Sequence, residues 1–441
     1  MPADQVYRWV FDIPVPRRQL WRFVSDTQRI NRLAGLFHVD YQYRPLQSGG
    51  SEVHGRARTG GLTLRWIERP GEWIEPRFFR ITRDYQSGPF QRLVSEVQLE
   101  DGEEPGTTRL TQLVTITPNG RWGAIVSRIG SRATKRGFAR AYALAERWAA
   151  EQGLPFDAQA QPQALREQVR ARLEERLEPL SERLEVPEVY EQLREHLAGQ
   201  PPEELASLAP YVLADRWQLP RQSVLRLFLH GAKNGAFDVQ YNLICPSCRR
   251  SKAVFTALAD VTTTGHCPTC NIDFGVDFDR AVEVRFSPAP LGLEDEPIEY
   301  CHASPQNTPH RIASWFVEPG ARQTWEFEIR PGRHQLVSPQ CKGAVFCQVV
   351  DDPAAPTRAE VTLTEEGIHG LPRQLRAGPM TLTAETKFAA RDSDERSTLT
   401  LVRALWADDA VSAAEITAMQ DFRDLFGAEI LAPGAEFAVQ N

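Results

Sequence analysis

The sequence predicts an α+β multidomain protein, and three observations support this fold class. The chain has 441 residues, whereas a single domain usually holds roughly 100 to 200. Hydrophobic residues make up 41% and charged residues 25% of the chain, which are ordinary values for a folded globular protein. Runs of segments with the composition of β-strands and runs of segments with a helical period occupy separate stretches of the chain.

The N-terminal third predicts a strand, a helix, an antiparallel meander and a long closing helix. Gln5 to Ile13 has the pattern of an apolar strand, and a helical pattern follows Pro16. Short strand-like segments then alternate with Gly, Pro and Asp clusters between residues 41 and 117. From Gly120 to Glu151 we expect one helix across the sheet, with an apolar face formed by Val126, Ile129, Ala133, Ala141, Leu144 and Trp148.

Charge excludes a general attraction to nucleic acid or to an anionic membrane, because the net charge is −7 and the pI about 5.8. The net charge of the whole chain does not exclude a local basic patch. Arginines recur at every fourth position of the long N-terminal helix, at 128, 132, 136 and 140. Such a stripe suits a phosphate or an acidic surface, but the simpler interpretation is a solvated flank whose stems cover the apolar face.

The middle of the chain predicts a helical linker over residues 154–201. Leu165, Val169, Leu173 and Leu177 recur at four-residue spacing there. We expect this stripe to pack within its own chain, although it also suits a homodimer. Residues 202–243 then predict two helices, a turn and a strand, which resemble half of a winged helix. The second helix is too apolar to reach base edges, so no nucleic-acid partner is expected.

Four cysteines predict a zinc ribbon at residues 244–278. Cys245 and Cys248 form one Cys-x-x-Cys pair, and after eighteen intervening residues Cys267 and Cys270 form another. This spacing places four thiolates for tetrahedral Zn²⁺, and a site with four protein ligands has no open position, so its role is structural. A redox dithiol pair and iron are the weaker alternatives. His266 is expected beside the metal ligands or on the surface.

The three remaining cysteines, Cys301, Cys341 and Cys347, are expected to be inert thiols. An odd cysteine count with two tight pairs fits a reducing compartment, and the N-terminus lacks the pattern of a secretory signal, so we expect a cytoplasmic protein. No stretch is apolar enough for a membrane span. Neither a Walker-type phosphate loop nor a G-x-S-x-G nucleophile elbow occurs in the sequence.

The C-terminal half predicts a β-sandwich at residues 279–410 and a C-terminal helical segment at 411–441, with the helix itself at 412–426. The sandwich follows from regularly spaced strand-like segments with turn residues between them. These segments lie at residues 281–286, 311–317, 323–329, 332–337, 344–350, 359–363, 380–386 and 398–405.

Residues 1–153 resemble the helix-grip fold of the polyketide-cyclase and START-like (SRPBCC) superfamily. The resemblance rests on the strand at 6–11, the helix at 15–26 and the helix at 120–151. It implies an apolar cavity that holds a hydrophobic small molecule. By residue type, the candidates for the pocket are His38, Tyr41, Tyr43, His54 and Trp66. A polyketide cyclase or aromatase-like enzyme is a lesser alternative.

Residues 200 to 435 resemble the region that precedes the catalytic domain in many bacterial class III adenylate/guanylate cyclases. The matching stretches are 213–217, the two Cys-Pro-x-Cys motifs, 278–286, 305–310 and 422–426. The resemblance implies a sensory or regulatory region that controls an attached cyclase domain, and catalysis only if the natural protein continues past Asn441. No metal-binding aspartate pair or substrate-recognising Lys and Asp of the family can be matched here. A stand-alone ligand-binding adaptor or scaffold for a partner protein is the alternative.

Overall fold

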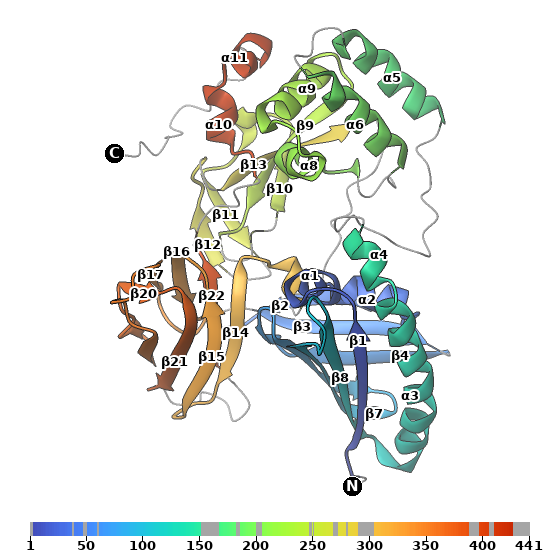
Figure 1. The fold of residues 1–441 in the computed structure, drawn as a ribbon, viewed down its shortest axis with the longest axis vertical. Helices are drawn as coiled ribbons and strands as arrows, with labels where there is room; N and C mark the ends of the chain where they lie inside the picture. The colour runs from blue at the N-terminus through green and yellow to red at the C-terminus, as the bar shows by residue number, and fades with distance from the viewer. Residues whose placement is uncertain are drawn as a thin grey trace. The chain divides into compact units, whose positions relative to one another are not determined.

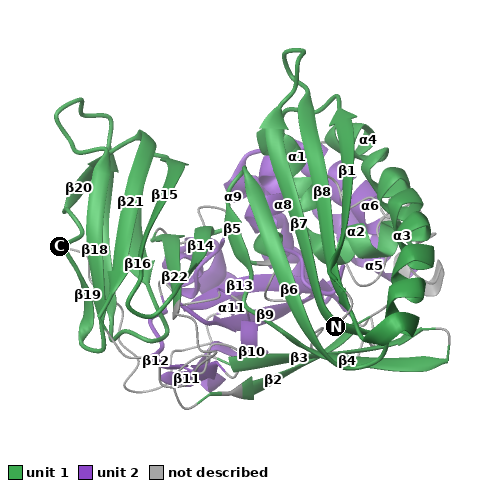
Figure 2. Ribbon diagram, turned by 90° about the horizontal axis from the view of Figure 1, so that it is seen from below, with its two compact units in different colours: residues 1–158, 298–405 green, residues 159–297, 406–441 purple. Residues whose placement is uncertain are grey.

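A computed structural model of the chain describes residues 3–37, 39–46, 51–59, 61–150, 167–181, 186–199, 205–246, 249, 251–267, 272–278, 281–289, 304–387, 397–404 and 410–426. The chain forms two compact units (Figure 2). Unit 1 consists of Met1–Ala158 and Ile298–Leu405, and unit 2 consists of Gln159–Pro297 and Trp406–Asn441. The sequence therefore passes between the units three times.

The first part of unit 1 follows the predicted order of strand, helix, antiparallel strands and closing helix, but a second short helix follows the first, and the closing helix expected as one from Gly120 is divided after Tyr142. Its elements are β1 (Gln5–Ile13), α1 (Arg17–Val24), α2 (Thr27–Leu33), β2 (Val39–Pro45), β3 (Ser51–Thr59), β4 (Leu62–Glu68), β5 (Glu72–Ile74), β6 (Phe78–Ser87), β7 (Phe90–Asp101), β8 (Thr108–Pro118), α3 (Gly120–Tyr142) and α4 (Ala145–Ala150). The strands pair antiparallel in the order β1-β8-β7-β6-β4-β3-β2. The predicted mixed α+β class is confirmed.

Helix α3 lies along one face of this sheet (Figure 1), with its main contacts on β1, β8 and α2. Alternate residues of β1 point toward it, because side chains alternate between the two faces of a strand. Trp9 lies 6.1 Å from Phe138 between ring centroids, and Phe11 lies 5.2 Å from Tyr142. We use the term inner face for this side of the sheet.

The buried side of α3 differs from the expectation, because Ile129 and Ala133 are exposed. Two glycines explain the rotation of the helix. A Cβ atom on Gly137 would lie 2.3 Å from the carbonyl oxygen of Ala34, and one on Gly123 would lie 2.0 Å from that of Pro89. The helix backbone therefore approaches its neighbours closely at these two positions, which turns Ile129 outward.

The second part of unit 1 is the predicted β-sandwich. Its elements are η2 (Pro305–Asn307), β14 (Arg311–Val317), β15 (Arg322–Ile329), β16 (Gly332–Val337), β17 (Ala344–Val350), β18 (Arg358–Thr364), β19 (Gly367–His369), β20 (Gln374–Arg376), β21 (Gly378–Thr386) and β22 (Ser397–Arg403). One sheet has the order β14-β22-β16-β17-β20 and the other β15-β21-β18-β19. Buried residues of both sheets form one core, in which Trp315 and Phe327 lie 5.3 Å apart.

The sandwich continues the sheet of the N-terminal part, since β14 pairs antiparallel with β5. The backbone N–H of Glu75 donates to the carbonyl of Ile312 at 2.9 Å, and Nε1 of Trp73 donates to that of Arg311 at 3.0 Å. The two parts of unit 1 thus share one sheet of thirteen strands.

Unit 2 consists of helices around a small sheet. Its elements are α5 (Glu167–Ser181), α6 (Pro187–Gly199), α8 (Pro210–Trp217), α9 (Arg221–Lys233), β9 (Phe237–Ile244), β10 (Ser251–Phe255), η1 (Leu258–Asp260), β11 (Thr264–Cys267), β12 (Ile272–Gly275), β13 (Val282–Pro288), α10 (Ala413–Ala418) and α11 (Gln420–Phe426). The sheets are β10-β9-β13 and β11-β12. Strand β13, expected at the start of the sandwich, pairs with β9 in unit 2 instead.

The helices of unit 2 agree with one expectation and differ from another. Leu173 and Leu177 of α5 are buried in the core of their own unit, which confirms packing within the chain at these positions. Leu165 and the side chain of Val169 lie outside the described residues. The single helix expected at 412–426 is divided into α10 and α11, because Met419 has extended backbone angles. Within the described residues, no helix is both long enough and apolar enough to span a membrane.

Candidate functional site

Two rows of side chains cross the inner face of the sheet over β2, β3, β4 and β6. Antiparallel partners share a face, so the register places Tyr41, Gly55, Trp66 and Tyr85 in one row. The second row consists of Tyr43, Val53, Glu68 and Arg83. The strand pairing continues this face through β7 and β8 to the side that contacts α3.

A buried carboxylate lies at the centre of these rows. Glu68 is 2% exposed, and its Oε2 accepts hydrogen bonds from Trp66 Nε1 at 3.0 Å, Arg83 Nε at 3.0 Å and Tyr41 Oη at 3.4 Å. The Arg83 guanidinium also lies over the Trp66 ring, 5.0 Å from its centroid. A buried carboxylate needs such partners, because an unpaired buried charge is costly. We call Tyr41, Trp66, Glu68, Arg83 and Tyr85 the Glu68 cluster.

Aromatic rings enclose one side of the Glu68 cluster. The Trp66 ring lies 5.5 Å from that of Tyr85 and 6.5 Å from that of Phe37. Burial raises the pKa of the Tyr85 hydroxyl above its usual value, so this hydroxyl stays protonated. A Cβ on Gly55 would lie 2.2 Å from the Trp66 ring, so the absence of a side chain at this position leaves room for the ring over β3.

Part of the inner face beside the Glu68 cluster is only half-buried. Val39, Tyr43 and Val53 are of intermediate exposure, and they pack against the small clusters around Tyr41 and Trp66. These two clusters are separate from the main core beneath α3. The inner face therefore presents an apolar surface next to a group of hydrogen-bonding side chains.

The structure brings together three of the five residues expected to line a ligand pocket, namely Tyr41, Tyr43 and Trp66. His54 lies on the opposite face, where its Nε2 is 2.6 Å from a carboxylate oxygen of Glu52. His38 lies outside the described residues. Sequence reasoning missed Glu68 and Arg83. The available signal was a glutamate at a position of β4 whose alternation otherwise buries Leu64 and Trp66.

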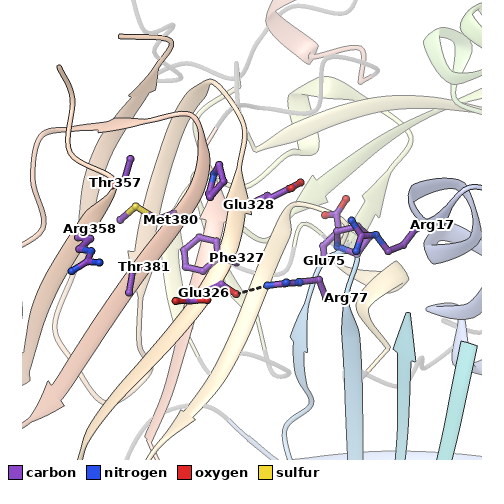
Figure 3. A pocket seen from close by; sticks show the side chains of 12 residues that line it. Arg17, Glu75, Arg77, Glu326, Phe327, Glu328, Thr357, Arg358, Met380 and Thr381 are labelled. Carbon is purple, nitrogen blue, oxygen red and sulfur yellow. Dashed lines mark hydrogen bonds between the residues drawn. The ribbon is translucent and has the colours of Figure 1, made fainter. Parts of the chain in front are cut away.

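A second candidate is a cavity of about 370 Å³ within unit 1, which the sequence did not predict (Figure 3). It is lined by α1, the segment between β5 and β6, and strands of the sandwich, through Arg17, Glu75, Pro76, Arg77, Glu326, Phe327, Glu328, Thr357, Arg358, Pro379, Met380 and Thr381. Arg77 donates from Nη1 to the carbonyl of Glu326 at 3.0 Å, as Figure 3 shows.

The charged residues of this cavity do not select a ligand by charge, because three arginines and three glutamates line it. Several of them already have partners: Arg17 lies 3.3 Å from a carboxylate oxygen of Asp101, and Glu328 lies 2.9 Å from Arg18. Burial raises the pKa of Glu75, against the opposing influence of nearby arginines. The cavity is therefore a less specific candidate than the Glu68 cluster.

The structure describes two of the four cysteines expected to bind zinc, one from each Cys-x-x-Cys pair. Cys245, directly after β9, and Cys267, at the end of β11, are fully buried and form one small cluster with Ile272 and Phe274. The N–H of Arg249 donates to the carbonyl of Cys245 at 2.7 Å, and Arg249 has φ of 52°. Adjacent buried thiols are donors of the type that Zn²⁺ takes.

The other two cysteines, Cys248 and Cys270, lie outside the described residues. Among the residues that are described, no group of three or more His, Cys, Asp or Glu could hold a metal ion. His266 has a half-exposed side chain, and its Nδ1 lies 2.8 Å from a carboxylate oxygen of Asp273. The zinc site of four thiolates therefore stays a prediction.

Comparisons with known proteins give limited similarity. The profile of a family of unknown function (DUF5939) matches residues 173–291. No curated protein matches the chain. Similar solved structures include a protein from Thermus thermophilus, with 17% identity and a TM-score of 0.25, and the Zhui aromatase/cyclase from Streptomyces sp. R1128, with 10% identity and a TM-score of 0.28.

A third similar structure is the di-domain ARO/CYC BexL from the BE-7585A biosynthetic pathway, with 14% identity and a TM-score of 0.24. Each of these similarities covers 33% of this chain. They cover 98%, 96% and 49% of the Thermus, Zhui and BexL chains, respectively.

Proposed function

We propose that this chain is a ligand-binding regulatory protein, and that the inner face of its N-terminal sheet binds a small hydrophobic molecule with one hydrogen-bonding group. The observation that carries this proposal is the Glu68 cluster. It places donors and a carboxylate beside the half-buried apolar surface of Val39, Tyr43 and Val53. Ligand sites typically combine an apolar lining with a few placed polar groups in this way.

The arrangement favours binding over catalysis. Oε2 of Glu68 already accepts hydrogen bonds from Tyr41, Trp66 and Arg83, so this oxygen is held in place by its neighbours. A general base needs an oxygen within reach of a substrate proton. A cyclase or aromatase-like activity is the lesser alternative, and turnover of an aromatic polyketide substrate by the purified chain would favour it.

Ligand binding can be tested by fluorescence titration with anilinonaphthalene sulfonate, an apolar probe with one anionic group. The Arg83→Gln variant should weaken binding by about tenfold, because the Arg83 guanidinium is the cation of the Glu68 cluster and a hydrogen bond from a charged group to the sulfonate contributes roughly 1.5–3 kcal/mol. The matched control is Arg92→Gln, since Arg92 is also paired with a carboxylate, that of Asp84, but its strand pairing places it on the opposite face. Equal probe affinity in both variants would place the bound probe elsewhere.

The finer form of the proposal is that the chain controls an attached adenylate/guanylate cyclase domain in a bacterial protein. Its support is the set of stretches in unit 2 and around residue 305 that resemble the region preceding such domains. Helix α11 carries the last of these stretches and contacts α9, where Arg226 lies 3.2 Å from a carboxylate oxygen of Asp421. A ligand-dependent shift of this contact would be the means of control.

Sequencing the gene beyond the codon for Asn441 and assaying any longer product for cyclic AMP tests the link. A continuation with cyclase activity would make this chain a regulatory region. A stop codon at that point would favour the alternative, a stand-alone adaptor whose output is a partner protein. In either case we propose that Zn²⁺ has a structural role and that its ligands would be Cys245, Cys248, Cys267 and Cys270.

A further inference from the structure

Helix α3 carries a basic face that no other described residue neutralises. The helix contains six basic residues and no acidic one, namely Arg121, Arg128, Arg132, Lys135, Arg136 and Arg140. All six are exposed. Throughout the part of the chain that the structure describes, none of the six forms an ion pair. This local charge opposes the net charge of −7 of the whole chain.

The same side of α3 exposes large apolar residues. Trp122 is 68% exposed, Ile125 is 50% exposed and Ile129 is 69% exposed. They lie three and four positions apart, and this spacing places them on one face of a helix. The row continues at Arg132 and Arg136, so apolar and basic side chains share one side of the helix. Gly123 and Gly137 lie on the opposite side of the helix, where its backbone closely approaches Pro89 and Ala34. This close approach fixes the outward orientation of the apolar and basic side chains.

We propose that this face of α3 docks onto the surface of an anionic lipid bilayer. The indole of Trp122 suits the boundary between headgroups and acyl chains, and Ile125 and Ile129 would enter the acyl region. The arginines would bind lipid phosphates, and their long stems allow the charged ends to stay at the headgroup level. This surface lies outside the Glu68 cluster and serves a different purpose.

The shape and composition of the face favour a bilayer over other acidic partners. The basic and apolar residues extend over some 20 positions of α3, or about 30 Å, along one side of the helix, and this long exposed side suits an extended surface. Single-stranded nucleic acid would need aromatic rings on which bases stack, and two of the three exposed apolar residues are isoleucines. Acidic proteins offer charge but no acyl interior for these side chains.

Vesicle sedimentation with the full chain tests the proposal, using phosphatidylcholine with and without phosphatidylserine. The chain should bind only the vesicles that contain phosphatidylserine. Arg132→Glu with Arg136→Glu should lower the binding constant at least about twentyfold, since each basic residue near an anionic surface contributes about fivefold. The matched control is Arg373→Glu with Arg376→Glu, two exposed arginines of the sandwich. It should bind like the original chain.

Insertion is tested by quenching of tryptophan fluorescence with brominated acyl chains. Quenching should occur in the original chain and be lost in Trp122→Phe, whose other tryptophans are unchanged. Absence of binding to phosphatidylserine vesicles overturns the proposal. So does binding that the double arginine variant leaves unchanged. If ultracentrifugation shows a dimer that the same variant dissociates, and vesicles are not bound, the face instead joins two copies of the chain.

Discussion

Glu68 and Gly55 show how single residues set the inner face of the sheet. Glu68 occupies a position where the alternation of β4 calls for an apolar side chain, and its partners come from β2, β4 and β6. Gly55 has no side chain where the Trp66 ring crosses β3. The indole N–H can reach Glu68 because that space is open. The two residues therefore act together in positioning Trp66.

Replacing Gly55 by alanine should displace Trp66, because the new Cβ would lie 2.2 Å from Cε2 and 2.5 Å from Nε1 of the ring. We expect the free energy of unfolding to fall by about 1–3 kcal/mol, the usual cost of overpacking a core. Urea denaturation measures this change. The control is Gly130→Ala on α3, where a Cβ meets no atom within 4 Å. This control should be neutral or slightly stabilising, and an equal loss in both variants would contradict the argument.

His196 should make the chain sensitive to acid. It is a buried residue of α6, with its ring 5.8 Å from that of Trp217. Burial, together with the charge of Arg216, lowers the pKa of His196 from 6.5 to about 4. Below about pH 6.5 the imidazole of His196 binds a proton in the unfolded state but not in the folded state. The free energy of unfolding therefore falls as the pH drops from 6.5 toward 4.

The corresponding experiment compares the free energy of unfolding at about pH 7 and about pH 5. The original chain should lose about 2 kcal/mol more over this interval than His196→Gln, which has no proton to bind. The exposed His369→Gln serves as the control and should behave like the original chain. Parallel pH profiles for the original chain and His196→Gln would show that His196 does not carry this effect.

Among the elements, β9, β11 and β12 bring Cys245 and Cys267, one member of each cysteine pair, into one region of unit 2. Cys245 follows β9 and Cys267 ends β11, and both are buried with Phe274 of β12. The strands of this region are short, with β11 and β12 at four residues each. Such a small sheet has little apolar area of its own. A metal ion would supply the stability that the hydrophobic core does not.

Zinc removal should therefore lower the melting temperature. Elemental analysis of the purified chain should find about one zinc ion per chain, as expected for one site of four thiolates. Cys248→Ser should lower both the zinc content and the melting temperature, because one thiolate ligand is lost. Cys347→Ala, a buried thiol of the sandwich, should keep its zinc. Zinc-free protein with an unchanged melting temperature would rule out the structural role.

For unit 1 as a whole, the pairing of β14 with β5 joins two regions that the sequence presents as separate domains. The contact includes two backbone positions and the bond from Trp73 to Arg311, 238 residues further along the chain. Hydrogen bonds across this pairing connect the sheet of the N-terminal part with that of the sandwich. We expect the two parts of unit 1 to unfold together.

Trp73→Phe should weaken this connection by removing the indole N–H that binds the Arg311 carbonyl. The loss is expected to be about 1 kcal/mol, typical of one hydrogen bond. Hydrogen exchange should show lower protection in both β5 and β14. The control is Trp148→Phe, because the buried Nε1 of Trp148 has no partner among the described residues. Hydrogen exchange in β5 and β14 should not change in Trp148→Phe. If Trp73→Phe lost protection in β5 alone or in β14 alone, the result would contradict joint unfolding.

The sequence by itself determined the order and type of most elements. Alternation and turn residues predicted β1, β4, β8 and the strands of the sandwich close to their observed bounds. The same patterns predicted the start of α3 and the burial of α5 within its own unit. These features depend on residues close together in the chain, which periodicity records directly.

Only the tertiary structure decided which distant residues meet. The Glu68 cluster, the cavity beside Glu75 and the bond from Trp73 to Arg311 all join segments far apart in sequence. The outward turn of Ile129 depends on close backbone contact at Gly123 and Gly137. Strand register and helix rotation are set by packing between elements, and the local pattern of one element contains no record of its neighbours.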